Sequence, residues 1–257
     1  MKKYHFISGL PRSGSTLLTS ILNQNPDFNS NISNPLARFV RAIITEPHAS
    51  PGYALQCPEK KQIELIQNLI STYYSDVSAN VCFNTNRGWT NLLQHLEKVS
   101  PDSKVICCVR DIPWILDSFE RLFKSNPFQL SNMYSSQEVE TVYSRSYALM
   151  TPGHTVSFAY DSLKEAITGP QKHNVMLVDY EQLAKYPENT MRAIYNFIGE
   201  PYFNHDFDNV ETMYEEYDLE SGISGLHTIR KKVEFIERPS ILPPDLFNHF
   251  NSLSVWK

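Results

Sequence analysis

Short apolar runs along the chain alternate with longer stretches in which apolar residues recur every three or four positions. The short runs are Tyr4–Ser8, Val81–Asn84, Lys104–Val109 and Val175–Val178, and each predicts a strand. The run KVICCV at 104–109 is apolar almost throughout, which is typical of a strand buried on both faces of a parallel sheet. The pattern therefore predicts four strands, one of them deeply buried.

The longer stretches predict helices, because their apolar residues fall on one face at the helical repeat. The predicted helices are one from Leu17 to the stop at Asn25-Pro26, a short one near Leu36–Ile44, then Glu59–Tyr74, Trp89–Val99, one from Pro113, Glu138–Met150, Tyr160–Ile167, and one from Pro187 to a cap at Gly199. The rest of 29–58 is rich in Asn, Ser and Pro and predicts a loop. The segment of about 205–257 predicts irregular structure.

Strands that alternate with helices predict an α/β fold, in which a parallel sheet is covered by helices on both faces. A chain of 257 residues can bury a core large enough to need no disulfide or metal. The sequence shows neither an internal repeat nor a low-complexity linker. We therefore expect a single domain over residues 1–257.

Composition and charge exclude several classes of protein. The net charge is −5 with no long run of one sign, which argues against nucleic-acid binding because that function needs a basic face. The four cysteines show no C-x-x-C spacing, so we expect reduced, mostly buried thiols and no metal site. The apolar stretch after Lys2 and Lys3 ends before Arg12 and is too short for a signal peptide or a membrane span. We therefore expect a cytoplasmic protein.

The segment GLPRSGST, from Gly9 to Thr16, lies between the first strand and the first helix. Its spacing matches the phosphate-binding pattern G-x-x-x-x-G-K-[ST], except that Ser15 replaces the lysine and Arg12 supplies a cation. Backbone N–H groups of such a loop form an anion nest, and the next helix directs its positive end at the same point. Hydroxyls of Ser13, Ser15 and Thr16 add donors, and the Arg12 guanidinium suits phosphate or sulfate oxygens.

The missing lysine argues against hydrolysis of ATP or GTP, in which it neutralises the β- and γ-phosphates. Instead, Pro11-Arg12-Ser13-Gly14-Ser15-Thr16 resembles the phosphosulfate loop P-[KR]-[ST]-G-[ST]-T of the sulfotransferase superfamily. The arginine form is typical of its tyrosylprotein and carbohydrate sulfotransferases. The resemblance implies that these six residues bind 3′-phosphoadenosine 5′-phosphosulfate (PAPS).

A second segment resembles the 3′-phosphate motif of the same superfamily. Arg110 and Asp111 end the buried strand, and Ser118 follows on the next helix. Strand ends are where open α/β sheets bind ligands, so Arg110 should face the same crevice as the loop. The family often has proline directly after the Arg-Asp pair, whereas here Ile112 precedes Pro113. We expect this departure to alter only the start of the helix.

The chain is thus similar to PAPS-dependent sulfotransferases over about residues 3–200, including a late segment at 178–199. The resemblance implies in-line transfer of a sulfuryl group from PAPS to a hydroxyl or amine, without a required metal. Its product would be adenosine 3′,5′-bisphosphate (PAP). It also implies that the irregular segment 205–257 packs over the cofactor site, where Arg230 is a candidate contact for the 3′-phosphate.

Sulfuryl transfer needs cations near the leaving group and a base for the acceptor proton. We assign Arg12 to the leaving phosphate, and Arg87 follows the second predicted strand like the lysine of related sulfotransferases. The region 31–35 lacks the glutamate that tyrosylprotein sulfotransferases carry there. His227, in a glycine-containing loop beside a basic stretch, is our candidate base because histidine titrates in the useful range. Other nearby candidates are Glu46 and His48.

Two alternatives remain open. A Mg²⁺-dependent P-loop kinase would need a lysine in the loop, although Asp111 could hold the metal; a non-catalytic nucleotide-binding relative would account for the missing glutamate. No motif identifies the acceptor, which could be a small molecule, a carbohydrate or a protein, and none indicates the oligomeric state. Aromatic candidates for an acceptor pocket are Phe39, Tyr53, Trp89, Trp114 and the region of Tyr134.

Overall fold

A parallel five-stranded sheet forms the centre of the computed structural model, which describes residues 2–126, 128, 134–211, 218 and 224–256. The strands are β1 (Lys3–Gly9), β2 (Phe28–Asn31), β3 (Val81–Thr85), β4 (Val105–Val109) and β5 (Val175–Asp179). Their order is β2-β3-β1-β4-β5, and each neighbouring pair is parallel. The predicted α/β fold with a parallel sheet is therefore confirmed.

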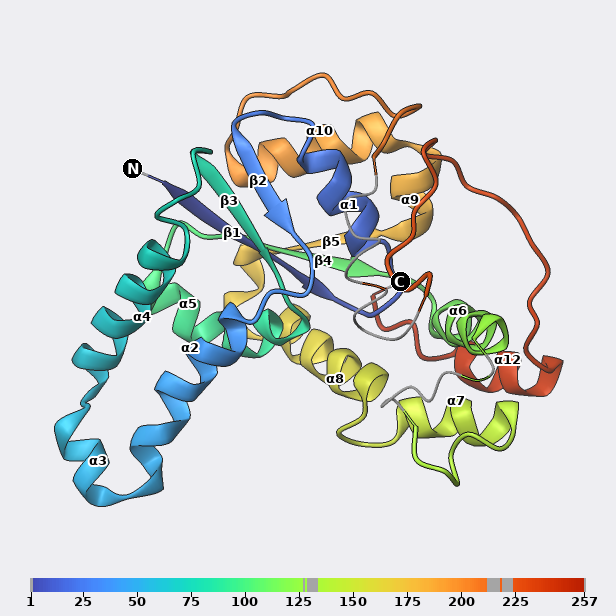
Figure 1. Cartoon of the computed structure of the whole chain (residues 1–257), viewed down its shortest axis with the longest axis horizontal. Coiled ribbons are helices and arrows are strands. Elements are labelled where there is room, and N and C mark those ends of the chain that lie inside the picture. Colours follow the sequence, from blue (N-terminus) through green and yellow to red (C-terminus); the bar gives the residue numbers. More distant parts are fainter. Residues whose placement is uncertain (1, 127, 129–133, 212–217, 219–223, 257) are drawn as a thin grey trace.

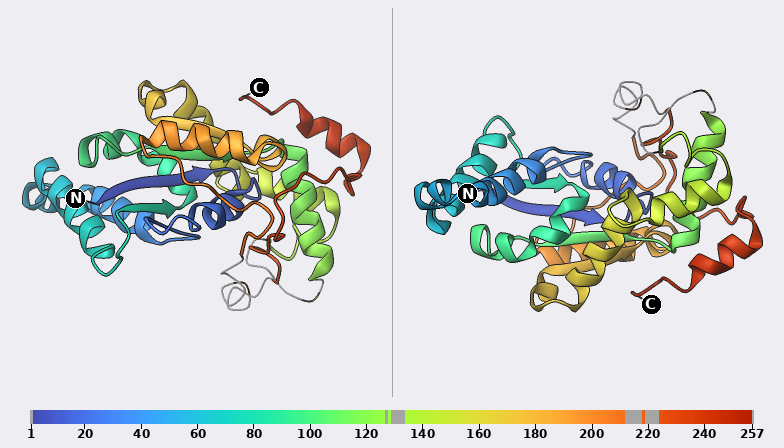
Figure 2. Two further views of the ribbon diagram at one scale, coloured as in Figure 1. Left: turned by 90° about the horizontal axis from the view of Figure 1, so that it is seen from above. Right: turned by 90° about the horizontal axis from the view of Figure 1, so that it is seen from below.

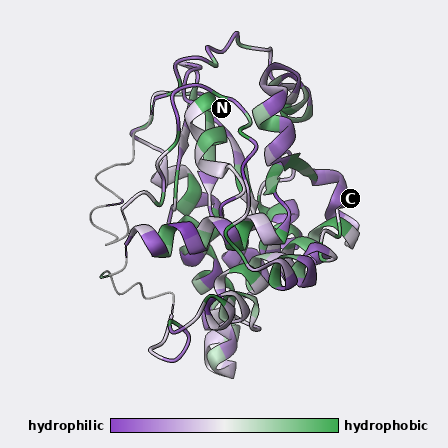
Figure 3. Cartoon of the chain, turned by 90° about the vertical axis from the view of Figure 1, so that its right-hand side faces the viewer, coloured by the Kyte–Doolittle hydropathy of each residue, from purple (hydrophilic) through white to green (hydrophobic). Residues whose placement is uncertain are grey.

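Helices cover both faces of this sheet (Figures 1 and 2). One face packs against α1 (Ser15–Leu22), α9 (Tyr180–Lys185) and α10 (Pro187–Ile198). The other packs against α2 (Leu36–Thr45), α4 (Glu59–Tyr73), α5 (Leu93–Val99), α6 (Ile112–Ser125), α7 (Val142–Met150), α8 (Thr155–Thr168) and α12 (Pro244–Asn251). Successive residues of a strand point to opposite faces of the sheet. In β4, Cys107 therefore packs in the hydrophobic core on one face and Cys108 in the core on the other. Hydrophobic and hydrophilic residues alternate along the helices around the sheet (Figure 3), as expected of helices with one buried and one exposed face.

Several elements differ from the sequence prediction. Strand β2 lies in the segment predicted as a loop. Its sequence FNSN has no apolar run to indicate a strand, because β2 is an edge strand that pairs with β3 alone and buries only Phe28 and Ser30. The short helix α3 (Pro51–Gln56) and the 3-10 helix η1 (Glu46–Ala49) also lie there. The predicted helix at 89–99 divides into the 3-10 helix η2 (Arg87–Leu92) and α5. Before β5 lies a further 3-10 helix, η3 (Pro170–Asn174).

Two helix starts also differ from prediction. Helix α7 begins at Val142 rather than at Glu138, because the hydroxyl of Thr141 accepts a hydrogen bond from Ser144 N at 3.0 Å and caps the helix. Helix α8 begins at Thr155, before the predicted Tyr160. The end of α10 matches its prediction, since Gly199 closes it in the left-handed conformation at φ 72°.

The C-terminal segment is not irregular throughout, because it contains α12. It is also anchored on α6 through Asp117. The carboxylate of Asp117, which is fully buried, accepts hydrogen bonds from Ile241 N at 2.8 Å and Ser240 Oγ at 3.2 Å and forms an ion pair with Arg238. A buried carboxylate needs such partners. Asp117 therefore holds residues 238–241 against the helix that also carries Ser118.

Cys82, Cys107 and Cys108 are buried, Cys57 is half-buried, and none of the four forms a disulfide in the described part of the chain. No described helix is both long and apolar enough to cross a lipid bilayer.

Candidate active site

A cavity of 1210 Å³ opens at the carboxyl ends of the strands. Residues that follow each strand line it: Gly9–Thr16 (except Ser13) after β1, Ser33 and Asn34 after β2, Arg87 after β3, Arg110 after β4 and Tyr180 after β5. Between β1 and β4 the strand order reverses direction, and such switch points form ligand crevices in open α/β sheets. The segments that the sequence singled out thus border one cavity.

The loop between Gly9 and Gly14 is pinned to β4. A Cβ atom at Gly9 would lie 2.2 Å from the carbonyl oxygen of Cys108, so only glycine permits this approach. Leu10 N and Ser13 Oγ both donate hydrogen bonds to that oxygen, each at 2.9 Å. The hydroxyl of Ser13, which we expected to face the ligand, is thus engaged inside the loop, and the Ser13 side chain is buried.

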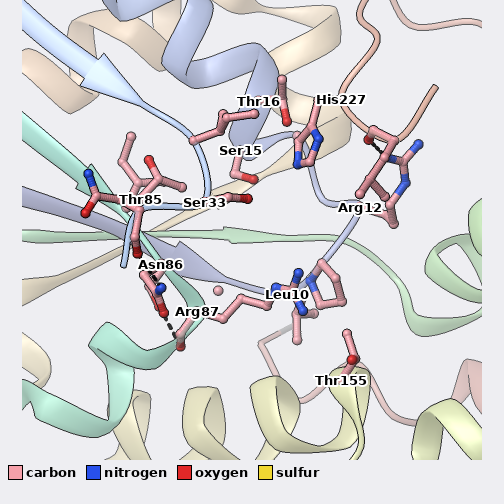
Figure 4. A pocket seen from close by; sticks show the side chains of 18 of the residues that line it. Leu10, Arg12, Ser15, Thr16, Ser33, Thr85, Asn86, Arg87, Thr155 and His227 are labelled. Atoms are coloured by element: carbon pink, nitrogen blue, oxygen red, sulfur yellow. Dashed lines mark hydrogen bonds between the residues drawn. The ribbon is translucent and has the colours of Figure 1, made fainter. Parts of the chain in front are cut away.

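The N-terminus of α1 faces the cavity, and its first turn carries no acidic side chain that would compete with a bound anion. No described side chain caps the helix at Gly14, whose φ is 94°. Ser15 and Thr16 line the cavity beside this helix end (Figure 4). Unpaired N–H groups and the positive end of the helix dipole therefore point to an anion site here.

Two arginines reinforce this site. Arg12, at φ 57°, donates from Nε to Ser118 Oγ at 3.0 Å and from Nη1 to the carbonyl oxygen of Leu226. The guanidinium of Arg110 stacks on the ring of Tyr180, with Cζ 4.3 Å from the ring centroid. Burial lowers the pKa of both guanidiniums, and each lines the cavity.

Carboxylates act on Arg12 and Arg110 at longer range: Asp218 raises the pKa of Arg12, and Asp117, Asp111 and Asp179 raise that of Arg110, against the larger effect of burial. Among ion pairs between described residues, neither arginine has a carboxylate partner. After burial, the proximity of Arg110 lowers the pKa of Arg12 further. An arginine nevertheless stays charged at neutral pH. A bound polyanion would relieve both the repulsion and the lost hydration.

His227 and Asp218 form a hydrogen-bonded pair at the cavity wall. The carboxylate of Asp218 lies 2.7 Å from Nδ1 of His227 and accepts from His227 N at 2.8 Å. Burial lowers the pKa of His227, Asp218 opposes that shift, and nearby Arg12 and Arg87 lower it again. The neutral ring therefore carries its proton on Nδ1, toward the carboxylate, and its lone pair on Nε2.

Asp218, a partner of the candidate site residue His227, was missed by sequence reasoning. It precedes His227 by nine positions, and no motif surrounds it. Only the fold of the C-terminal segment joins the two side chains. Gly222 and Ile223, which belong to the glycine-containing loop that drew attention to His227, lie outside the described residues.

The remaining candidates have mixed positions. Arg87 begins η2 and lines the cavity, and Ser8 Oγ donates to its carbonyl oxygen at 3.1 Å. Arg230 also lines the cavity but lies 3.8 Å from the carboxylate of Glu234, so its charge is shared. Of the alternative bases, Glu46 lines the cavity and His48 does not. Asp111 lies outside the lining and accepts from Ser254 Oγ at 2.8 Å.

The aromatic residues expected around an acceptor lie elsewhere. Phe39, Tyr53, Trp89, Trp114 and Tyr134 are all absent from the lining of this cavity. Trp89, for example, is fully buried and donates from Nε1 to Asn84 Oδ1 at 2.9 Å, as a core residue does. The aromatic residues that do line the cavity are Phe119, Phe158 and Tyr180.

Comparison with known proteins agrees with this geometry. The model of the Sulfotransferase family matches residues 5–204. Protein-tyrosine sulfotransferase 1 of Danio rerio is 23% identical over 242 residues, which are 91% of this chain and 62% of that protein, so the chain spans less than two thirds of this relative.

Solved structures show the same fold. The sulfotransferase domain from the curacin biosynthetic pathway has a TM-score of 0.61 at 17% identity, covering 98% of this chain and 97% of that one. Sulfotransferase STF1 from Mycobacterium tuberculosis H37Rv has a TM-score of 0.51 at 15% identity, covering 79% and 69%. Because the family match spans most of the chain, from β1 past α10, this protein belongs to the sulfotransferase family.

Proposed function

We propose that this protein transfers the sulfuryl group of PAPS to a hydroxyl or amine of an acceptor. The observation that carries the proposal is the convergence of the phosphate loop, Arg12, Arg87 and Arg110 on one cavity. A nest of backbone N–H groups with guanidinium groups around it suits a ligand that carries several phosphate-like groups. Family membership supports the same reaction class.

The donor would lie across the loop and the end of β4. Backbone N–H groups of residues 12–16 and the hydroxyls of Ser15 and Thr16 would hold the 5′-phosphosulfate, and Pro11, which has no N–H, would shape the loop. Arg110 and Ser118 would hold the 3′-phosphate, and Arg230 would close over it from the C-terminal segment. Since Arg12 is hydrogen-bonded to Ser118, the two anion sites are mechanically joined.

In the transfer, a bond forms between the acceptor oxygen or nitrogen and sulfur while the bond from sulfur to the bridging oxygen breaks. The electron pair of the broken bond stays on the 5′-phosphate of PAP, where Arg12 and Arg87 would stabilise the growing charge. The acceptor proton would pass to Nε2 of His227, whose neutral form is favoured by burial. Glu46, which also lines the cavity, is the alternative base.

The two rival functions receive less support. A Mg²⁺-dependent kinase would use a lysine where this chain has Ser15, and Asp111 does not line the cavity. A non-catalytic relative would bind the donor without a base, whereas His227 stands beside the cavity with Asp218 to orient it. Both rivals predict distinct outcomes in a binding experiment.

The test is a calorimetric titration with PAP in the absence of magnesium, compared with ATP plus magnesium. We expect micromolar binding of PAP, weakened in Arg110→Ala by about 1.5–3 kcal/mol, or roughly 10- to 150-fold, as for a hydrogen bond to a charged group. Arg192→Ala is the matched control, because Arg192 pairs with Glu188 on the exposed side of α10. Tighter binding of ATP with magnesium would favour a kinase. PAP binding without sulfation of any acceptor would favour a non-catalytic relative.

A further inference from the structure

One face of α2 forms a long wall of the cavity. The helix residues that line it are Ala37, Arg38, Arg41, Ala42 and Thr45. Positions three, four, seven and eight apart share a face of a helix, so this wall is continuous from the start of α2 nearly to its end. Two of these residues carry guanidinium groups, and the two alanines are apolar. None of the five belongs to either sulfotransferase motif.

The guanidinium of Arg41 lies between α8 and the turn at Gly88. It lies over the ring of Phe158, with Cζ 5.8 Å from the centroid. Its Nη2 atom lies 3.7 Å from the position that a Cβ atom at Gly88 would occupy. Gly88 directly follows Arg87, so the head group of Arg41 sits against the turn that carries a proposed catalytic cation.

Neither Arg38 nor Arg41 forms an ion pair with a carboxylate in the described part of the chain. Arginines elsewhere do, as Arg145 does with Glu120 at 2.8 Å and Arg192 with Glu188 at 2.7 Å. Two like charges three positions apart on one helix repel each other. An anionic ligand between them would remove that penalty.

The start of α8 adds a further positive end to the same region. Gly153, Thr155 and Phe158 line the cavity, and α8 begins at Thr155. No described side chain caps this helix at His154. The helix dipole therefore favours negative charge at the wall that already carries Arg41.

The sheet order separates this wall from the donor site. Arg110 follows β4, on one side of the β1 loop, whereas α2 follows β2 and Arg87 follows β3, on the other side. The phosphate loop and Arg110 account for the anionic groups of the donor. In the proposed donor binding mode, Arg38 and Arg41 would contact none of these anionic groups and would be available to an acceptor.

We propose that Arg38 and Arg41 form an acceptor subsite that binds a carboxylate, so that the acceptor class is a hydroxy acid with an apolar body. Ala42 and Phe158 would contact that body, and Arg87 would lie next to the hydroxyl. The inference rests on the proposed sulfotransferase function and specifies its acceptor.

The test uses two acids and their methyl esters as acceptors with PAPS: 3-(4-hydroxyphenyl)propanoate and 3-hydroxydecanoate. Sulfated product is measured by mass spectrometry, and binding of each acid to the PAP-loaded protein is measured by calorimetry. For at least one pair we expect kcat/KM for the acid to exceed that for its ester at least 10-fold. The double variant Arg38→Gln/Arg41→Gln should lose this preference and the binding of the acid while its affinity for PAP stays unchanged.

The matched control is Lys60→Gln/Lys61→Gln, which removes the same charge from exposed positions of α4 outside the cavity lining. It should keep the preference for the acid. Equal use of acid and ester, a preference that survives in the arginine double variant, or failure of both acids to bind the PAP-loaded protein would overturn the inference. Failure of the unmodified protein to bind PAP would instead overturn the sulfotransferase proposal itself.

Discussion

Arg12 Nε donates a hydrogen bond to Ser118 Oγ at 3.0 Å, which connects residues 106 positions apart. The contact joins the loop after β1 to α6, so the two anion motifs form one unit rather than two separate sites. The neighbouring Asp117 holds residues 238–241 from the same helix. A single helix therefore contacts both the proposed donor site and the C-terminal segment.

Replacing Ser118 with alanine should weaken PAP binding more than it affects folding. The variant Ser118→Ala removes the acceptor of the Arg12 hydrogen bond and the proposed donor to the 3′-phosphate, and we expect a roughly 5- to 30-fold higher Kd for PAP, which corresponds to about 1–2 kcal/mol. Calorimetry measures the Kd, and thermal unfolding checks the fold. Ser125→Ala on the same helix is the control, because the exposed Ser125 hydroxyl donates to the carbonyl oxygen of Arg121 within the helix and Ser125 is not part of the cavity lining. An equal Kd in both variants would refute this role for Ser118.

Alanine substitutions at Gly14 and Gly199, which both have positive φ, distinguish the effect of backbone strain from that of a steric clash. A Cβ atom at Gly14 would lie 2.9 Å from Cδ2 of Tyr180, whereas one at Gly199 would meet no atom within 4 Å. Both Gly14→Ala and Gly199→Ala should destabilise the protein by about 1–2 kcal/mol, since a side chain disfavours this conformation. Only Gly14→Ala should also displace Tyr180, which stacks on Arg110, and so weaken PAP binding. Equal PAP affinities for the two variants would contradict this link.

Replacing Asp218 with asparagine should change the pH dependence of catalysis. If neutral His227 is the base, activity falls as pH drops through its pKa, which already lies below the ordinary range. Asp218 raises that pKa, so in Asp218→Asn the acidic limb of the kcat profile should move to lower pH. An asparagine does not enforce the proton on Nδ1, so we also expect kcat to fall roughly 100-fold.

The control for this prediction is Asp208→Asn, because Asp208 is an exposed residue of the same segment and pairs with Lys232 at 3.0 Å. Its profile should match that of the unmodified protein. PAP affinity should not fall in either variant, since Asp218 does not line the cavity and loss of its negative charge near Arg12 does not remove a donor to the ligand. A profile unmoved in Asp218→Asn would show that His227 is not the titrating base.

Stability at acid pH should depend on His5 of β1. Burial first, and the charges of Lys3 and Lys104 next, lower the pKa of His5 to about 4, and its Nδ1 accepts from Lys104 N at 3.1 Å. The unfolded chain binds a proton near pH 6.5, so the stability from neutral His5 is complete above that pH. It is lost as pH falls toward 4, by on the order of 3 kcal/mol.

Urea unfolding between pH 7 and pH 4 measures this loss. His5→Gln, which lacks the titrating group, should show a flatter dependence of unfolding free energy on pH than the unmodified protein. His173→Gln is the control, because the His173 side chain is 62% exposed. Parallel pH dependences in the unmodified protein and His5→Gln would exclude His5 as a source of acid sensitivity.

Local sequence patterns were sufficient to predict the α/β fold class and four of the five strands of this protein. The apolar runs predicted β1, β3, β4 and β5, because a strand buried on both faces must be apolar at successive positions. The glycine spacing of 9–16 and Arg110 at a strand end predicted where the two anion motifs lie, since both depend on residues close together in the chain. Arg12, Arg87, Arg110 and His227 all line the cavity, as expected of residues at strand ends and in the late loop.

Tertiary structure decided what depends on distant partners. Strand β2 is polar and exists because β3 offers it an edge. The Ser13 hydroxyl turns inward because Cys108 of β4 supplies an acceptor, and His227 meets Asp218 only through the fold of the C-terminal segment. Arg38 and Arg41 belong to no motif and line the cavity because α2 packs beside it. Periodicity reports which face of an element is buried, but it carries no information about which distant side chain that face will meet.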